Sequence, residues 1–125
     1  MPKISIQPDC GNAPRKRFLK DFYVALATGD RDFISNNIPV TVSWEIIGEW
    51  KVAGLQSYLQ AIIKHKLWEL NELTVDTIIT HGPDAAVKGS VKTSDNLQFA
   101  FCDIYNFKGA GGTTIKSITT FLIEQ

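Results

Sequence analysis

The chain has 125 residues, enough for one hydrophobic core but too few for two. Its 13 basic and 13 acidic side chains balance, which argues against nucleic acid or an anionic membrane surface as the main partner. No apolar run approaches the ~20 residues of a membrane span, and the start lacks a signal-peptide core. The isolated Cys10 and Cys102 and only two histidines predict no disulfide framework and no metal site. We therefore expect one cytoplasmic domain spanning 1–125, without metal or cofactor.

The first part of the chain predicts two helices after a loose tail or short edge strand at 1–11. Asn12 as a capping residue and Pro14 in the first turn predict a helix start, followed by apolar residues at helical spacing. Gly29 is expected to end this helix, and Asp30 to cap a short second one.

A strand and a third helix are expected next. The β-branched content of residues 40–47 predicts a strand that stops at Gly48. Gly54 then precedes a helix with an apolar face, made by Leu55, Tyr58, Leu59, Ile62 and Ile63.

The second half of the chain predicts a run of strands separated by turn-forming residues, at 73–80, 85–93, 97–107 and 114–123. Connections this short make neighbouring strands antiparallel, because parallel neighbours need a long crossover. Helices followed by a strand meander predict an α+β domain with the helices packed on one sheet face.

The strand at 97–107 carries the most informative pattern. Alternate residues share one face of a strand, so Asp103 is expected to lie in a row with four aromatic rings, those of Phe99, Phe101, Tyr105 and Phe107. Apolar surroundings raise the pKa of a carboxyl group. The row therefore predicts the wall of an apolar pocket with one acidic group. The alternative is a structural aspartate that pairs with a lysine or tyrosine.

The order of these elements resembles that of the nuclear transport factor 2-like superfamily, which includes ketosteroid isomerase and the SnoaL-like polyketide cyclases. Three segments carry the resemblance: the helix-ending turn at 25–32, the strand at 44–48 followed by Gly54, and the strand and turn at 103–111. The resemblance implies three N-terminal helices packed in the concave face of a strongly curved, mixed and mainly antiparallel sheet. Such a domain is a cone-shaped α+β barrel with an apolar pocket.

The isomerase of that family uses a carboxylate base and a protonated aspartate, a known case of pKa tuning. The resemblance places the base at Glu45 and the protonated aspartate at Asp103. Glu45 follows Trp44, and adjacent strand residues point to opposite faces. If Trp44 fills the core, Glu45 is a surface carboxylate.

The oxyanion-binding tyrosine of the isomerase corresponds to Phe22, which has no hydrogen to donate. Tyr23 is rotated by ~100° from Phe22 around the helix, so we expect it at the edge of the apolar stripe. Tyr105, on the same strand face as Asp103, is the expected substitute, with Tyr58 as the alternative.

The sequence therefore predicts a pocket that binds a small apolar or amphipathic molecule. The alternative is an isomerase, cyclase or lyase acting by metal-free proton transfer through Asp103, Tyr105 and Glu45. A third hypothesis, compatible with both, is a homodimer formed through the outward sheet face that carries Lys88, Ser90, Lys92, Ala100, Cys102 and Ile104. The expected ligand-binding residues are Phe22, Trp44, Tyr58, Ile62, Phe99, Phe101 and Phe107.

Overall fold

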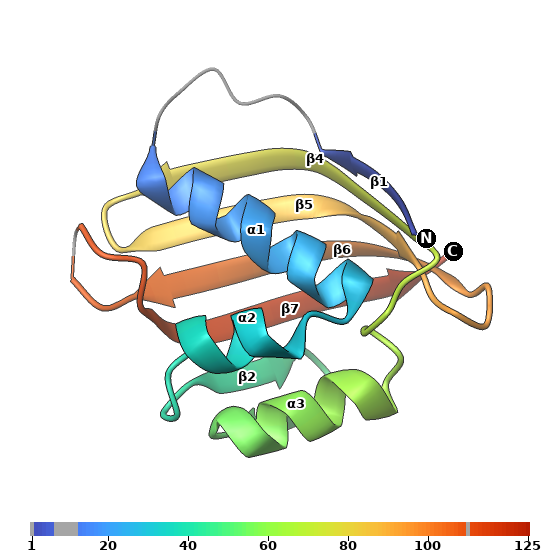
Figure 1. Ribbon diagram of the computed structural model, residues 1–125, viewed down its shortest axis with the longest axis horizontal. Helices are drawn as coiled ribbons and strands as arrows, with labels where there is room; N and C mark the ends of the chain where they lie inside the picture. Colours follow the sequence, from blue (N-terminus) through green and yellow to red (C-terminus); the bar gives the residue numbers. More distant parts are fainter. Residues whose placement is uncertain (1, 7–12, 110) are drawn as a thin grey trace.

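The computed structural model describes residues 2–6, 13–109 and 111–125, and its helices all lie on one side of a single curved sheet (Figure 1). Cys10, Asn12 and residue 110 of the last turn lie outside the described residues. The helices are α1 (Pro14–Thr28), α2 (Arg31–Asn37) and α3 (Leu55–Lys64). The strands are β1 (Lys3–Ile6), β2 (Ser43–Ile46), β3 (Trp50–Ala53), β4 (Glu72–His81), β5 (Asp84–Lys92), β6 (Gln98–Phe107) and β7 (Ile115–Glu124).

The helix ends form where local chemistry favours them. Pro14 begins α1, where its missing N–H leaves no hydrogen bond unmade, and Gly29 ends it at φ 73°. The Asp30 side chain accepts a hydrogen bond from the Phe33 backbone N–H and caps α2. The predictions for Pro14, Gly29 and Asp30 are confirmed. The prediction of Asn12 as the cap of α1 is wrong, because the N-cap residue is Ala13, whose side chain makes no capping hydrogen bond.

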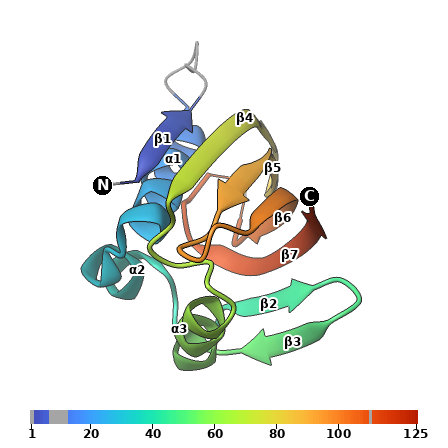
Figure 2. The same cartoon turned by 90° about the vertical axis from the view of Figure 1, so that its right-hand side faces the viewer.

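The seven strands form a sheet in the order β1-β4-β5-β6-β7-β2-β3. Among the strands of the described residues, only the pairs β1–β4 and β2–β7 are parallel, so the sheet is mixed and mainly antiparallel, as expected. The sheet curves around the helices without closing, because β1 and β3 remain its two edges (Figure 2).

Strand β4 contains an irregularity of the kind that bends a strand. Its register against β5 shifts between Val75 and Thr77, opposite Gly89. A Cβ atom on Gly89 would collide with the carbonyl oxygen of Thr74, so glycine permits this close approach of the strands.

One prediction about the first strand is wrong. Residues 40 and 41 form a turn, Val42 is outside any strand, and β2 occupies only Ser43–Ile46. The chain then turns at Gly48, with φ 81°, into β3, which pairs antiparallel with β2 and was not predicted. Four residues give too short an alternation to distinguish a strand from a loop.

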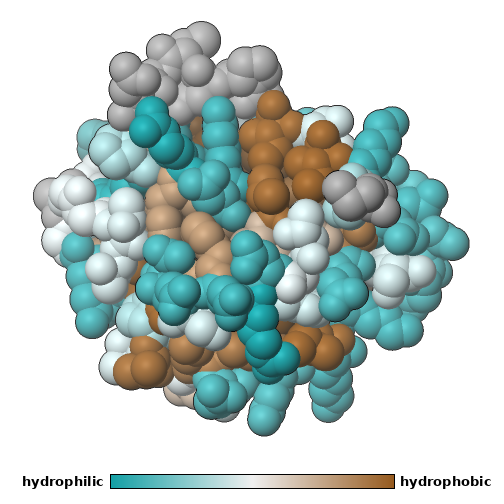
Figure 3. Space-filling model, viewed as in Figure 1, coloured by the Kyte–Doolittle hydropathy of each residue, from teal (hydrophilic) through white to brown (hydrophobic). Residues whose placement is uncertain are grey.

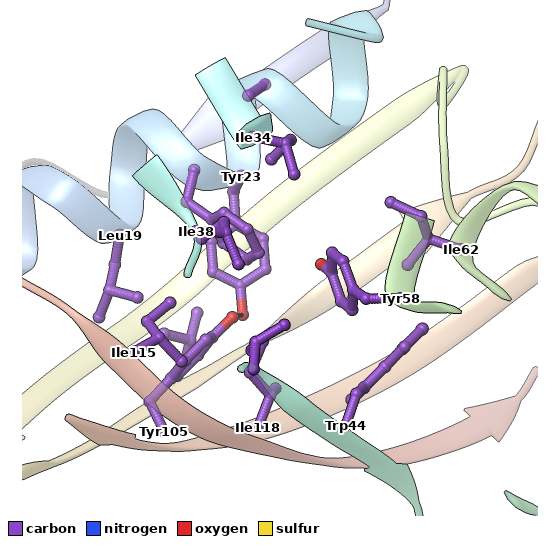
Figure 4. Packing of buried hydrophobic residues seen from close by; sticks show 14 of the residues in the cluster. Leu19, Tyr23, Ile34, Ile38, Trp44, Tyr58, Ile62, Tyr105, Ile115 and Ile118 are labelled. Atoms are coloured by element: carbon purple, nitrogen blue, oxygen red, sulfur yellow. Dashed lines mark hydrogen bonds between the residues drawn. The ribbon is translucent and has the colours of Figure 1, made fainter. Parts of the chain in front are cut away.

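The core lies between the helices and the concave side of the sheet, and Figure 4 shows part of this packing. The helix-covered side of the molecule is largely hydrophilic, with hydrophobic side chains exposed in separate groups (Figure 3). Among the described residues, no helix has the length and apolar character needed to cross a membrane.

Candidate functional site

A cavity lies between α1, α3 and the concave face of the sheet. The space open to the centre of a water molecule is about 50 Å³, and the lining is almost entirely apolar. Seven residues predicted for the site line this cavity: Phe22, Trp44, Tyr58, Ile62, Phe101, Asp103 and Tyr105. Tyr23 and Thr120 line it as well.

The polar groups of the cavity form one hydrogen-bonded chain. The Trp44 Nε1–H donates to Thr120 Oγ1 at 2.8 Å, and the Thr120 hydroxyl donates to Asp103 Oδ1 at 2.6 Å. The Tyr23 hydroxyl is hydrogen-bonded to Asp103 Oδ2 and lies 2.5 Å from the Tyr105 hydroxyl. Figure 4 shows the hydroxyl groups of Tyr23 and Tyr105 meeting, with the Tyr58 oxygen turned toward them.

The sheet register and helix α1 bring this chain together. Asp103 on β6 is the direct partner of Thr120 on β7, and β2 pairs with the other edge of β7 and supplies Trp44. The Tyr23 side chain comes from α1, 80 residues earlier in the sequence than Asp103.

Burial sets the acid–base behaviour of the cluster. Asp103 is only 8% exposed, and burial raises its pKa to about 6, although hydrogen bonds from Thr120 and Tyr23 lower it. Burial and the nearby Asp103 also hold the pKa values of Tyr23, Tyr58 and Tyr105 well above their usual range. The tyrosines are therefore neutral hydroxyl groups, and Asp103 changes charge near neutral pH.

Three residues that we expected at the site are not among the described residues that line the cavity. Glu45 lies on the opposite face of β2 from the buried Trp44, with its side chain 37% exposed and 4.0 Å from the Lys51 ammonium. Phe99 is half-buried at one end of β6, and Phe107 is buried at the other, under the Arg15 guanidinium. The structure therefore does not bring Glu45 together with Asp103, and the cavity spans only the middle of the aromatic row.

Tyr23, which the sequence placed at the edge of the apolar stripe, is brought to Asp103 by the structure. Phe22 and Tyr23 are both buried, at 1% and 4% exposure, and their rings are in edge contact. A helix lying in a concave sheet is covered over a wider arc than a helix on a flat surface, so two adjacent positions face inward. The position of this tyrosine next to the apolar stripe of the helix was the sequence feature that could have identified it as a cavity residue.

Among the described residues, no three His, Cys, Asp or Glu side chains lie together as a metal site requires. The hydroxyl and carboxyl groups of the cavity can instead donate hydrogen bonds to, or accept them from, a ligand within an apolar enclosure.

The comparison with known proteins rests on structure. No family pattern and no curated protein matches the sequence. Among solved structures, an NTF2-like protein of unknown function from Burkholderia xenovorans LB400 superposes with a TM-score of 0.73 at 16% identity, covering 88% of this chain and 83% of that one. The chain has the nuclear transport factor 2-like (NTF2-like) fold.

Two other structural neighbours are named after enzymes. A candidate SnoaL-like polyketide cyclase from Shewanella denitrificans OS-217 has a TM-score of 0.72 at 10% identity, covering 86% of this chain and 89% of its own. An LEH-like epoxide hydrolase from M. tuberculosis has a TM-score of 0.67 at 14% identity, covering 85% and 80%. At these identities the similarity establishes the fold and leaves the activity open.

Proposed function

We propose that this NTF2-like domain binds a small apolar molecule that carries one polar group. The observation that supports the proposal is the apolar cavity with hydroxyl and carboxyl groups of Tyr23, Tyr58, Tyr105 and Asp103 converging on it. Ligand sites typically combine a mostly apolar lining with a few polar groups that fix orientation. The space of about 50 Å³ is smaller than the ~150 Å³ cavity that accommodates benzene, so a ring compound binds only when the lining side chains move apart.

Two adjacent residues of α3 provide a matched test. Ile62 is buried and lines the cavity, whereas Ile63 is 42% exposed. Small ring compounds with one carbonyl or N–H group are titrated against the protein, and chemical shifts of the Trp44 indole N–H are followed by NMR. We expect Ile62→Phe to abolish binding by filling the cavity, and Ile63→Phe to bind like the natural chain.

The stability of each variant is checked first by circular dichroism, because an added ring in a packed core typically costs about 1–3 kcal/mol. If folded Ile62→Phe binds the same compounds with unchanged affinity, the ligand does not occupy this cavity and the proposal is wrong.

An enzyme that moves a proton is the second candidate. The raised pKa of Asp103, about 6, supports it, because general acids and bases work best near the operating pH. Structural neighbours named as a cyclase and an epoxide hydrolase share the fold. Asp103 is the only carboxyl group among the described lining residues, so it would both take up and return the proton.

Exchange of the α-hydrogens of 1-indanone in D₂O tests this candidate, and Asp103→Asn is expected to abolish any acceleration. An exchange rate equal to the buffer rate contradicts the candidate for this substrate class.

We also propose that two copies associate through the outward sheet face. Large apolar side chains are exposed there: Ile79, Ile104, Phe121 and Ile123. Ile104 lies on the same row as Ala86 and Ile79, while Phe121 and Ile123 are opposite Cys102 and Ala100. A contiguous apolar face on strands β4 to β7 is typical of an interaction surface.

Location in the reducing cytoplasm stays a prediction from cysteine usage.

A further inference from the structure

The hydrogen-bonded chain in the cavity has a direction that starts at Trp44. An indole N–H can only donate, so Thr120 Oγ1 accepts from Trp44. Among the described residues, the only hydrogen-bond acceptor for the Thr120 hydroxyl is Asp103 Oδ1. Because Oδ1 accepts from Thr120 in both charge states, a proton on Asp103 lies on Oδ2, the oxygen that faces Tyr23.

The contact between Tyr23 and Asp103 holds one hydrogen, and so does the 2.5 Å contact between Tyr23 and Tyr105. When Asp103 is ionised, Tyr23 donates to the carboxylate. The hydrogen in the second contact then comes from Tyr105, so Tyr105 offers the cavity only lone pairs.

When Asp103 is protonated, it donates to the Tyr23 oxygen. Tyr23 then donates to Tyr105, and the Tyr105 hydrogen is free to point into the cavity. One proton on Asp103 thus reverses both tyrosine hydroxyls without moving a heavy atom.

We propose that the protonation state of Asp103 selects the class of ligand, with hydrogen-bond acceptors such as ketones favoured by the acid form and N–H or O–H donors by the carboxylate form. This inference rests on the proposed ligand-binding function. It makes Tyr105 the group that meets the ligand, and Trp44 and Thr120 positioning residues that fix the proton on Oδ2.

Few other titratable groups face Asp103. Tyr23 faces it from α1 and Tyr58 from α3, and Tyr105 lies beside it on β6. Its strand partners are Val87 on β5 and Thr120 on β7. No lysine, arginine or histidine occurs among the described lining residues, so the reversal follows the titration of Asp103, with a pKa of about 6.

A pair of neutral ligands of similar size tests the proposal. 1-Indanone carries a carbonyl and only accepts, whereas indole carries an N–H and only donates, and neither titrates between pH 4.5 and 8. Dissociation constants are measured by NMR titration across this range. We expect 1-indanone to bind about fivefold more tightly at pH 4.5 than at pH 8, and indole to show the opposite trend, since one hydrogen bond is gained or lost.

Asp103→Asn separates this mechanism from a general effect of pH. The amide oxygen can accept from Thr120 and the amide N–H can donate to Tyr23, which reproduces the acid form at every pH. We expect this variant to keep the tight binding of 1-indanone up to pH 8. Asp21→Asn, which removes an exposed carboxylate on the same helix as Tyr23, should keep the natural pH dependence.

Binding of both ligands with no dependence on pH in the natural chain overturns the switch but leaves the ligand-binding function standing. Failure of both ligands to bind at any pH overturns the switch and the binding of ring compounds of this size together.

Discussion

Asp103 is a buried carboxyl group whose neutral form is favoured by the fold. Its pKa is about 6 in the folded chain, against about 3.9 for an unfolded aspartate. Between these values the folded state binds more protons than the unfolded state. The free energy of unfolding therefore falls as pH rises from about 4 to about 6, and stays level above that range as far as this group is concerned.

Asp103→Asn is expected to remove this dependence. The stability of the variant relative to the natural chain should rise by about 2 kcal/mol between pH 4 and pH 7, because most of the difference between the folded and unfolded pKa values is titrated in this range. Urea unfolding at several pH values measures the difference. A difference that stays constant across this range would show that folding does not raise the pKa of Asp103.

Helix α1 is joined to the hairpin turns of the sheet by Arg15. The guanidinium is 7% exposed and donates to the carbonyl oxygens of Gly112 at 2.6 Å and Gly109 at 2.9 Å, and to that of Gly82. It also lies 4.5 Å from the centre of the Phe107 ring. One side chain thus connects the start of α1 with both the β4–β5 and the β6–β7 turns, at the Phe107 end of β6.

Arg15→Ala should lower the free energy of unfolding by about 3 kcal/mol, because three carbonyl groups lose a charged donor and Phe107 loses its cover. Hydrogen exchange should increase most around residues 82 and 109. Arg17→Ala, at an exposed position of the same helix, is the control and should change stability by less than about 0.5 kcal/mol. Equal effects of the two substitutions would contradict the role of Arg15.

The outward face of strands β4 to β7 is the proposed dimer interface. A stable interface usually buries about 800 Å² on each partner, which four neighbouring strands can supply. Phe121→Glu together with Ile104→Glu places charges within the exposed apolar face. We expect the natural chain to sediment as a dimer at micromolar concentration and the variant as a folded monomer. Val40→Glu, at a position that is 75% exposed in the turn before β2 and outside strands β4 to β7, should leave the dimer intact. A natural chain that sediments as a monomer excludes this interface.

The helix ends and strand faces follow from local chemistry, and the sequence alone predicted them. Gly29 and Asp30 act through backbone geometry and capping, and strand periodicity placed Phe101, Asp103 and Tyr105 together on the inner face. The short strand β3 was not predicted, because four residues give too little periodicity to identify a strand.

Only the tertiary structure decided which inward-facing groups meet in the cavity. Tyr23 and Thr120 reach Asp103 through helix docking and strand pairing, neither of which leaves a mark in the local sequence. Phe99 and Phe107 share the strand face but lie beyond the described cavity lining, because the curvature of the sheet confines the open space to the middle of β6. Periodicity is a property of neighbouring residues, whereas a cavity depends on how distant elements pack.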